Sequence, residues 1–166
     1  MGNAGTRAFR LFYMSKENNH SEEDILEAVM KSPFASLNDD EIHRFLKLCT
    51  FKSYKSGECV RFPDDPEREM TMVIKGVVTI YNVDKTRIMA QFEPGDCLGM
   101  MSLLFPIHKA TRAYATDEDN LVLVFSEENF RKIGEIDPKL AMSIMRRIID
   151  FMTPYVEAAA NAMAEL

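Results

Sequence analysis

The residue types that could bind a ligand gather in one segment, between Gly99 and Arg112. Lys109 could pair with a phosphate or a carboxylate, and the hydroxyls of Ser102 and Thr111 could donate hydrogen bonds to the same group. Each residue also has an explanation that involves no ligand. Lys109 could be a solvated surface lysine, Ser102 a small residue that lets a helix pack closely, and Thr111 a β-branched strand residue. The segment therefore predicts an anion site, provided that the fold brings these side chains together.

Four glycines divide the middle of the chain into short segments, and the first three of them are spaced 19 residues apart. They are Gly57, Gly76, Gly95 and Gly99. Glycine admits positive φ angles, which suit a strand that must turn sharply or a backbone that is approached closely. The spacing therefore predicts short strands joined by tight turns.

Apolar and polar residues alternate between about residue 50 and residue 126, as in strands that bury one face. Met70, Met72 and Ile74, for example, should point to one side of their strand, away from Val73. About eight such segments occur without a long helix between them, which argues against a parallel sheet. We expect a mainly β fold, an eight-stranded antiparallel β-roll of the double-stranded β-helix or jelly-roll type, with flanking helices.

Capping patterns predict helices on both sides of this roll. Ser21 begins a capping box that ends at Asp24, and Asn38 and Ser126 are further N-cap candidates. Asp137 is followed by a proline, a pair that favours the start of a long C-terminal helix. Pro154 lacks an N–H group and should kink or end that helix.

The sequence thus divides into three parts. Residues 1–20 form an N-terminal arm, residues 21–136 the roll with its flanking helices, and residues 137–166 the C-terminal helix. Hydrophobic residues make up 46% of the chain, which is enough to bury the core of one domain.

Charge and cysteine usage exclude several classes of protein. The net charge of −6 argues against nucleic acid and against an anionic membrane as partners, because both require clustered Lys and Arg. The three cysteines are scattered and odd in number, as in a protein with reduced thiols. No apolar run has the length of a membrane-spanning helix, so we expect a cytoplasmic protein.

Four motifs follow one another in the order found in the cyclic nucleotide-binding domain. They are residues 54–58, an opening turn; 73–78, a hairpin; 92–99, the approach to a ligand site; and 115–125, the closing strands. Over residues 33–156 the chain resembles this family, which includes the catabolite activator proteins and the regulatory subunits of cAMP-dependent kinase. The resemblance implies a regulatory β-roll and a cyclic nucleotide, or another small anion, as its ligand.

In this family a phosphate-binding cassette follows the last glycine, which makes residues 98–111 the cassette segment of this chain. The resemblance implies backbone N–H groups on the phosphate, an acid on the ribose 2′-hydroxyl and an arginine on the phosphate. Met100 and Lys109 occupy the acid and arginine positions here. The implied ligand-binding residues are Gly99, Met100, Met101, Ser102, Lys109, Ala110 and Thr111, with Arg112 as a spare cation.

These two replacements weaken the expected contacts. A thioether is a poor acceptor, so the charged hydrogen bond lost at Met100 is worth about 1.5–3 kcal/mol. Lys109 keeps the charge but lacks the planar bidentate fork of arginine. We therefore expect weak binding of cAMP and cGMP in the family's usual manner, and either a more apolar pocket or one filled by its own side chains. Arg112 could replace Lys109 only with a longer cassette loop.

The C-terminal helix carries an apolar seam with alternating steps of four and three residues, as in a coiled coil. Its members are Ala141, Met145, Ile148, Met152, Tyr155 and Ala159. A second stripe, Leu140, Ile144 and Phe151, could pack on the roll, although one broad face buried in a monomer would give the same pattern. Because the family's matching helix pairs with its twin, the resemblance favours a homodimer.

We interpret the chain as a non-catalytic regulatory or sensor module that binds a small anionic or nucleotide-like ligand and signals through its C-terminal helix to an unidentified protein. Two alternatives remain open: a ligand-free interaction scaffold and a cupin-like enzyme. Cupins need clustered His and Glu metal ligands, whereas none of the predicted strands contains a histidine. No nucleophile, base and acid are grouped either, so we predict no enzyme activity and no metal site.

Overall fold

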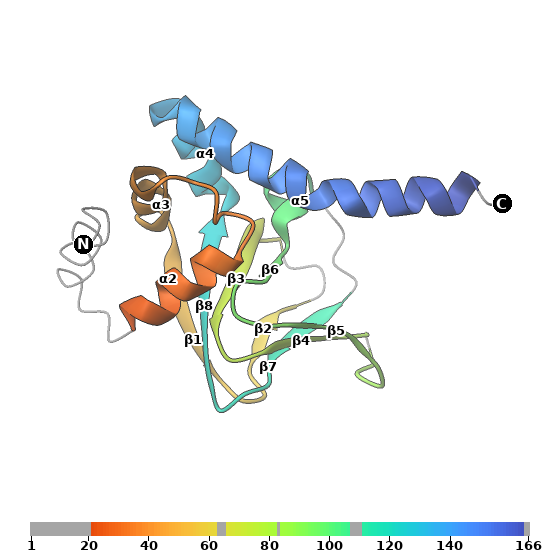
Figure 1. Cartoon of the computed structure of the whole chain (residues 1–166). Helices are drawn as coiled ribbons and strands as arrows, with labels where there is room; N and C mark the ends of the chain where they lie inside the picture. Colours follow the sequence, from red (N-terminus) through yellow and green to blue (C-terminus); the bar gives the residue numbers. More distant parts are fainter. Residues whose placement is uncertain (1–20, 63–65, 83, 107–110, 165–166) are drawn as a thin grey trace.

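The computed structural model describes residues 21–62, 66–82, 84–106 and 111–164; the predicted N-terminal arm lies outside these residues (Figure 1). Within them, eight antiparallel strands form two four-stranded sheets, with the orders β1-β8-β3-β6 and β2-β7-β4-β5. The strands are β1 (Thr50–Lys55), β2 (Cys59–Arg61), β3 (Glu69–Lys75), β4 (Val78–Tyr81), β5 (Ile88–Phe92), β6 (Cys97–Leu98), β7 (Arg112–Ala115) and β8 (Asp119–Ser126). The predicted antiparallel β-roll is confirmed.

Strand β3 separates two apolar cores. Met70, Met72 and Ile74 belong to the larger core, between the first sheet and the helices, while Val73 belongs to the smaller core between the two sheets. The predicted alternation is therefore confirmed. Both faces of β3 are buried because helices cover the outer face of its sheet (Figure 1).

Helices precede and follow the sheets, and their N-caps are those that the sequence predicts. Within the described residues the α-helices are α2 (Glu22–Lys31), α3 (Asp39–Leu46), α4 (Glu127–Ile136) and α5 (Pro138–Ala164). Asn38 and Glu41 form a reciprocal capping box, with bonds of 2.9 and 3.0 Å to each other's backbone N–H. The other side chains that accept hydrogen bonds from first-turn N–H groups are Ser21, Ser126 and Asp137.

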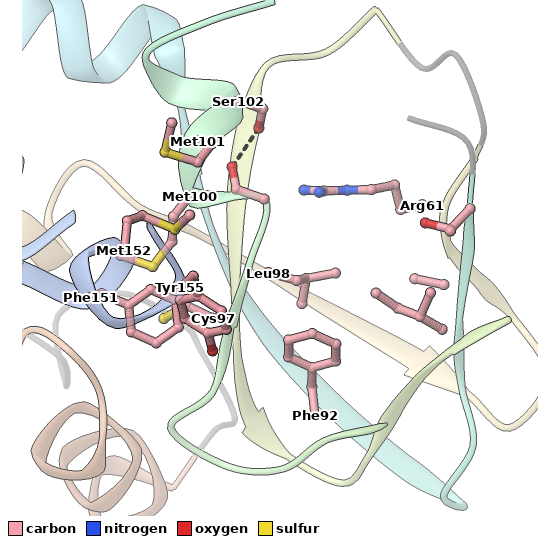
Figure 2. A pocket seen from close by; sticks show the side chains of 14 residues that line it. Arg61, Phe92, Cys97, Leu98, Met100, Met101, Ser102, Phe151, Met152 and Tyr155 are labelled. Atoms are coloured by element: carbon pink, nitrogen blue, oxygen red, sulfur yellow. Dashed lines mark hydrogen bonds between the residues drawn. The ribbon is translucent and has the colours of Figure 1, made fainter. Parts of the chain in front are cut away.

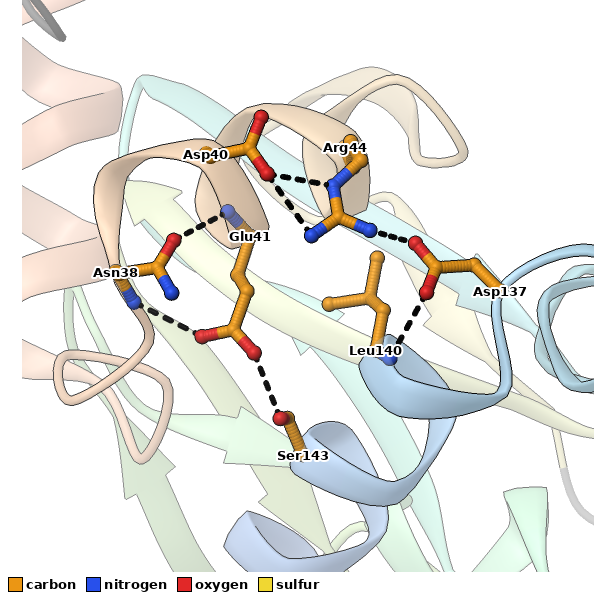
Figure 3. A network of polar contacts seen from close by, with 7 residues as sticks. All are labelled: Asn38, Asp40, Glu41, Arg44, Asp137, Leu140 and Ser143. Atoms are coloured by element: carbon orange, nitrogen blue, oxygen red, sulfur yellow. Dashed lines mark hydrogen bonds and ion pairs between the residues drawn. The ribbon is translucent and has the colours of Figure 1, made fainter.

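A polar network joins α3 to the beginning of α5 (Figure 3). Arg44 lies 2.9 Å from a carboxylate oxygen of Asp40 on its own helix and also pairs with Asp137, the N-cap of α5. Glu41 accepts a hydrogen bond of 2.7 Å from the hydroxyl of Ser143, one turn further along α5. The first part of α5 is therefore fixed to α3 by groups that also cap both helices.

Helix α5 continues through Pro154 to Ala164, so of the two outcomes predicted at this proline, a kink or an end, the end does not occur. Figure 1 shows a bend about halfway along the helix. Proline removes one helical hydrogen bond, which explains a bend, and the Thr153 hydroxyl donates to the Ile149 carbonyl at 2.9 Å. All residues from 153 to 164 are exposed, so this half of α5 extends beyond the core.

The buried Asn120 side chain joins three turns at one end of the roll. It accepts a hydrogen bond from the N–H of Val77 at 3.1 Å and donates to the carbonyls of Asp117, at 2.6 Å, and Tyr54, at 3.3 Å. Gly76, with a φ of 81°, lies directly against it, and a Cβ at this glycine would collide with the Asn120 amide. The glycine and the asparagine therefore depend on each other.

We expect Asn120→Ala to lower the free energy of unfolding by about 1–3 kcal/mol, because it removes the hydrogen bonds through which a buried amide joins the three turns. Urea unfolding followed by circular dichroism measures the change. Asn82→Ala is the matched control, since Asn82 makes its hydrogen bonds in an exposed turn and should matter little. Equal unfolding midpoints for the two variants would contradict the role assigned to Asn120.

Candidate functional site

A cavity of about 540 Å³ opens between the roll and α5 (Figure 2). Its lining comes from four places: strand β2, the sheet around β4 and β7, the cassette segment and the middle of α5. The lining residues include Arg61, Ile80, Phe92, Leu98, Met100, Ala113, Phe151, Met152 and Tyr155. The cassette segment and the helix expected to carry a signal therefore border the same space.

The described part of the cassette segment lies between the two apolar cores. Leu98 points into the core between the sheets, whereas Cys97 and Met100 belong to the core that includes α5. In the view of Figure 2, Leu98, Phe92 and Arg61 lie on one side of this segment and the three α5 residues on the other. Any displacement of the segment must therefore disturb packing on both sides.

Gly99 connects β6 to the short 3-10 helix η1 (Met100–Leu103). Its φ of 76° lies in the left-handed region, which a residue with a side chain adopts only at a cost. Ser102 is buried, and its hydroxyl lies 2.8 Å from the Glu69 carbonyl and 2.5 Å from the Gly99 carbonyl. The single hydroxyl proton of Ser102 is therefore donated to a backbone carbonyl of the protein, and this bond closes the turn that Gly99 begins.

The structure brings together most of the predicted site residues. Gly99, Met100, Met101, Ser102 and Thr111 all line the cavity. Met100 is only 3% exposed, so an apolar side chain fills the position where the family resemblance implies an acid. Lys109 and Ala110 lie outside the described residues.

Arg61 is a cavity residue that the sequence analysis missed. It is 8% exposed, and its Nη2 donates a hydrogen bond of 2.8 Å to the Glu69 carbonyl. Its guanidinium lies so close to Gly99 that a Cβ on this glycine would overlap it. In the sequence Arg61 is a single arginine at the end of the short strand β2. Because arginines in such positions are commonly exposed, no sequence signal indicated that this one would be buried beside the cavity.

Arg68 is a second residue that the sequence analysis missed, and it joins η1 to α4. Its Nε and Nη2 donate to the carbonyls of Ser102, at 3.0 Å, and Leu103, at 3.2 Å. Its Nη1 lies 3.7 Å from a carboxylate oxygen of Glu127, and its carbonyl accepts from the Glu127 N–H at 2.7 Å. The first turn of α4 is thereby tied to the carbonyl groups of η1.

The sequence pattern of the cyclic nucleotide-binding domain matches residues 51–137, just over half of the chain. The chain belongs to the cyclic nucleotide-binding domain family. It is 26% identical over 102 residues to the Pycsar effector protein BcPycTIR of Burkholderia cepacia. That match covers 59% of this chain and 33% of the relative, so the chain corresponds to about a third of the relative's length.

Solved structures share the fold. The N-terminal domain of a transcriptional regulator from Streptomyces coelicolor has a TM-score of 0.69 at 18% identity, covering 80% of this chain and 94% of that one. A cyclic nucleotide-binding domain from Methylobacillus flagellatus gives 0.68 at 18% identity, covering 86% and 82%. The Catabolite Activator Protein of Thermus thermophilus gives 0.64 at 21% identity, covering 80% and 63%.

Arg112, the predicted spare cation of this cyclic nucleotide-binding domain, does not line the cavity. Side chains alternate along β7, so Ala113 faces the cavity while Arg112 and Tyr114 face the other side of the sheet. There the Lys85 ammonium lies 3.6 Å from the centre of the Tyr114 ring. Hydrogen bonds from Lys85 and then Arg112 lower the pKa of the Tyr114 hydroxyl. Arg112 thus interacts with the outer surface of the roll.

The predicted seam on α5 divides into two parts. Ala141 and Ile148 are buried in the core of the monomer, whereas Tyr155 is 61% exposed. The apolar residues along the outer half of α5 instead form a stripe with steps of three and four residues. We call these residues the α5 stripe: Ile149, Met152, Val156, Ala159 and Met163.

A second hollow of about 540 Å³ lies where α5 passes the end of η1. It is lined by Met101, Leu104 and Phe105 from one side and by α5 residues that include Ile149 and Val156 from the other. The α5 stripe therefore continues into an apolar groove on the surface of the domain.

None of the His, Cys, Asp and Glu side chains in the described residues forms a group of three or more that could hold a metal ion. None of the helices in this part of the chain has the length and the apolar character needed to cross a membrane.

We expect Gly99→Ala to lower the free energy of unfolding by at least about 1–2 kcal/mol, because the new Cβ requires a left-handed φ and displaces Arg61. Thermal or urea unfolding measures the change. Gly134→Ala is the matched control: Gly134 lies in α4 with open space around it, and alanine there should stabilise by up to about 1 kcal/mol. Equal effects at the two positions would contradict the close packing of Gly99.

Proposed function

We propose that this chain is a non-catalytic regulatory module that binds a small anionic or nucleotide-like ligand in the roll and signals through α5. One observation carries the proposal: the cavity is lined by the cassette segment and by Phe151, Met152 and Tyr155 of α5. A ligand in this cavity would contact both elements. Membership of the cyclic nucleotide-binding domain family supports the same function.

The coupling would act through packing and through Arg68. A ligand can shift a conformational equilibrium only by the difference in its affinity for the two states. Because η1 shares an apolar core with α5 and is held to α4 by Arg68, a ligand that displaced η1 would change the interactions of both helices. The outer half of α5 would then be presented differently to a partner.

The ligand we propose is a cyclic nucleotide or a similar small anion, held without the usual ribose contact. The buried Met100 offers a thioether where a carboxylate would accept a hydroxyl hydrogen bond. Apolar neighbours such as Leu98, Phe92 and Ile80 suit the flat face of a base. Recognition would therefore depend on the base and the phosphate more than on the sugar.

We further propose that two copies pair through the α5 stripe. Its three-and-four spacing is that of a coiled-coil seam, and Ile149, Val156 and Met163 are each more than half exposed in the monomer. Their burial against a second copy would remove a contiguous apolar surface from water. The deeply buried Ala141 and Ile148 would support this helix from within the monomer and would not form part of the interface.

A ligand-free scaffold is the second candidate, and one observation favours it. Ser102 and Met100 are both buried and already engaged inside the protein. In this alternative the domain would act through α5 alone. Ligand binding distinguishes the two candidates.

We expect calorimetry with cAMP, cGMP, cUMP and cCMP to detect binding of at least one of them, and hydrogen exchange to show changed protection near Tyr155 in the complex. Ala113→Leu should abolish binding, because Ala113 is buried and lines the cavity. Ala158→Leu on the exposed half of α5 is its control. Binding without a change in α5 would contradict signalling through this helix, and no binding of any probe would favour the scaffold.

The same assay tests the role of Arg68. Arg68→Gln should retain most of the ligand affinity, because Arg68 is not a cavity residue, but should diminish the response of α5 and α4. Arg131→Gln, on the exposed surface of α4, is the matched control. A full helix response in Arg68→Gln would show that the coupling does not pass through this arginine.

We expect the wild-type protein to dimerise in light scattering at micromolar concentration, and Val156→Glu to be monomeric. A buried carboxylate replaces an apolar contact from each subunit, which costs on the order of 3 kcal/mol and raises the dissociation constant about a hundredfold. Ala158→Glu adds the same charge outside the α5 stripe and should remain dimeric. A monomeric wild type, or identical masses for the two variants, would contradict pairing through the stripe.

A further inference from the structure

We infer that Arg61 supplies the positive charge that binds the anionic group of the ligand, so that the anion contact comes from β2 and not from the cassette segment. The inference rests on the proposed function, since it concerns the same cavity. It names a binding residue that neither the sequence motifs nor the family resemblance indicates.

The position of Arg61 supports this role. The residue is only 8% exposed, yet it lines the cavity, and Figure 2 shows its guanidinium pointing towards the cassette segment near Ser102. The bond from Nη2 to the Glu69 carbonyl fixes its orientation. An arginine held in place before the ligand arrives loses little conformational entropy on binding.

The surroundings of Arg61 select the chemistry of the ligand. A guanidinium remains charged at every pH at which proteins are folded. Leu98, Phe92, Ile80 and Ala113 line the same space with apolar groups, which strengthen an ionic hydrogen bond by lowering the local dielectric constant. The planar fork of arginine matches the oxygens of a phosphate. The cavity therefore suits a phosphate ester with a flat apolar body.

The close packing at Gly99 gives this cation a defined place. Because a Cβ on Gly99 would overlap the guanidinium, the glycine makes room for Arg61 at the turn where the cassette segment begins. The family resemblance implies that a phosphate lies beside this turn. Arg61 can thus take over the task of the cassette arginine, which is replaced by Lys109 in this sequence.

A consequence for specificity follows from the same geometry. With Met100 at the ribose position and the phosphate held by Arg61, the 2′-hydroxyl of a ribonucleotide has no charged acceptor in the described part of the cavity lining. A 2′-deoxy cyclic nucleotide should therefore bind as tightly as its ribose form. A site that used a carboxylate would lose about tenfold or more, corresponding to about 1.5–3 kcal/mol.

The experiment follows the Nε–H resonance of Arg61 by NMR in the full-length protein while inorganic phosphate is added, with chloride at equal ionic strength as the reference. We expect a saturable shift with phosphate and none with chloride. The matched variants are Arg61→Gln and Arg112→Gln, each of which removes one arginine charge from adjacent strands β2 and β7. Arg61→Gln should weaken phosphate binding about tenfold or more and Arg112→Gln should not.

Arg61→Gln also removes the bond to the Glu69 carbonyl, so its unfolding midpoint is measured in parallel. If the Arg61→Gln variant fails to fold, the Arg61 resonance of the wild-type protein still shows whether Arg61 binds phosphate. Absence of a saturable shift would overturn the inference and leave Arg61 as a structural link between β2 and β3. Loss of phosphate binding in Lys109→Gln, with Arg61→Gln unaffected, would overturn it as well.

Cyclic mononucleotides and linear 5′-nucleotides, added separately, identify the source of the phosphate. A phosphate-dependent shift of Arg61 without any effect of cyclic nucleotides on α5 would uphold the inference while the proposed function fails. A cyclic nucleotide that binds and changes α5 while the Arg61 resonance stays fixed would uphold the function and overturn the inference.

Discussion

The close approach of the Arg61 guanidinium to the left-handed Gly99 determines how the cassette segment is placed. No side chain fits between them, so β2 and the turn before η1 come into direct contact. The Ser102 hydroxyl closes the same turn, because its single proton lies between the Glu69 and Gly99 carbonyls, both within hydrogen-bond distance. A buried charge, a positive φ and an internal hydrogen bond are thereby concentrated in a few residues, all of them at the wall of one cavity.

The cassette segment contributes side chains to two apolar cores. On one side Leu98 enters the core between the sheets, and on the other Met100 enters the core shared with α5. Arg68 adds a polar link from η1 to the beginning of α4. Packed cores respond to displacement by repacking and not by gradual deformation, so the proposed signal from this segment would reach the helices through these contacts.

Local patterns in the sequence predicted a large part of this architecture. Asn38 and Ser126 cap helices because their side chains reach N–H groups within one turn. The alternation of Met70, Met72 and Ile74 assigned them to one face of β3. Pro154 was expected to kink or end α5, and the helix bends but continues beyond it, because the missing hydrogen bond of one proline does not outweigh the favourable propensity of the alanine-rich residues that follow.

The sequence by itself determined the antiparallel roll, its glycine turns and the position of the cassette segment, because periodicity, capping and left-handed glycines act over a few residues. Only the tertiary structure decided that Arg61, among the described residues, lines the cavity and which part of α5 remains exposed. Arg61 meets Gly99, and Arg68 meets Ser102, across more than thirty positions of the chain. Such pairs form when strands and helices pack, and no local pattern distinguishes their arginines from those that remain in solvent.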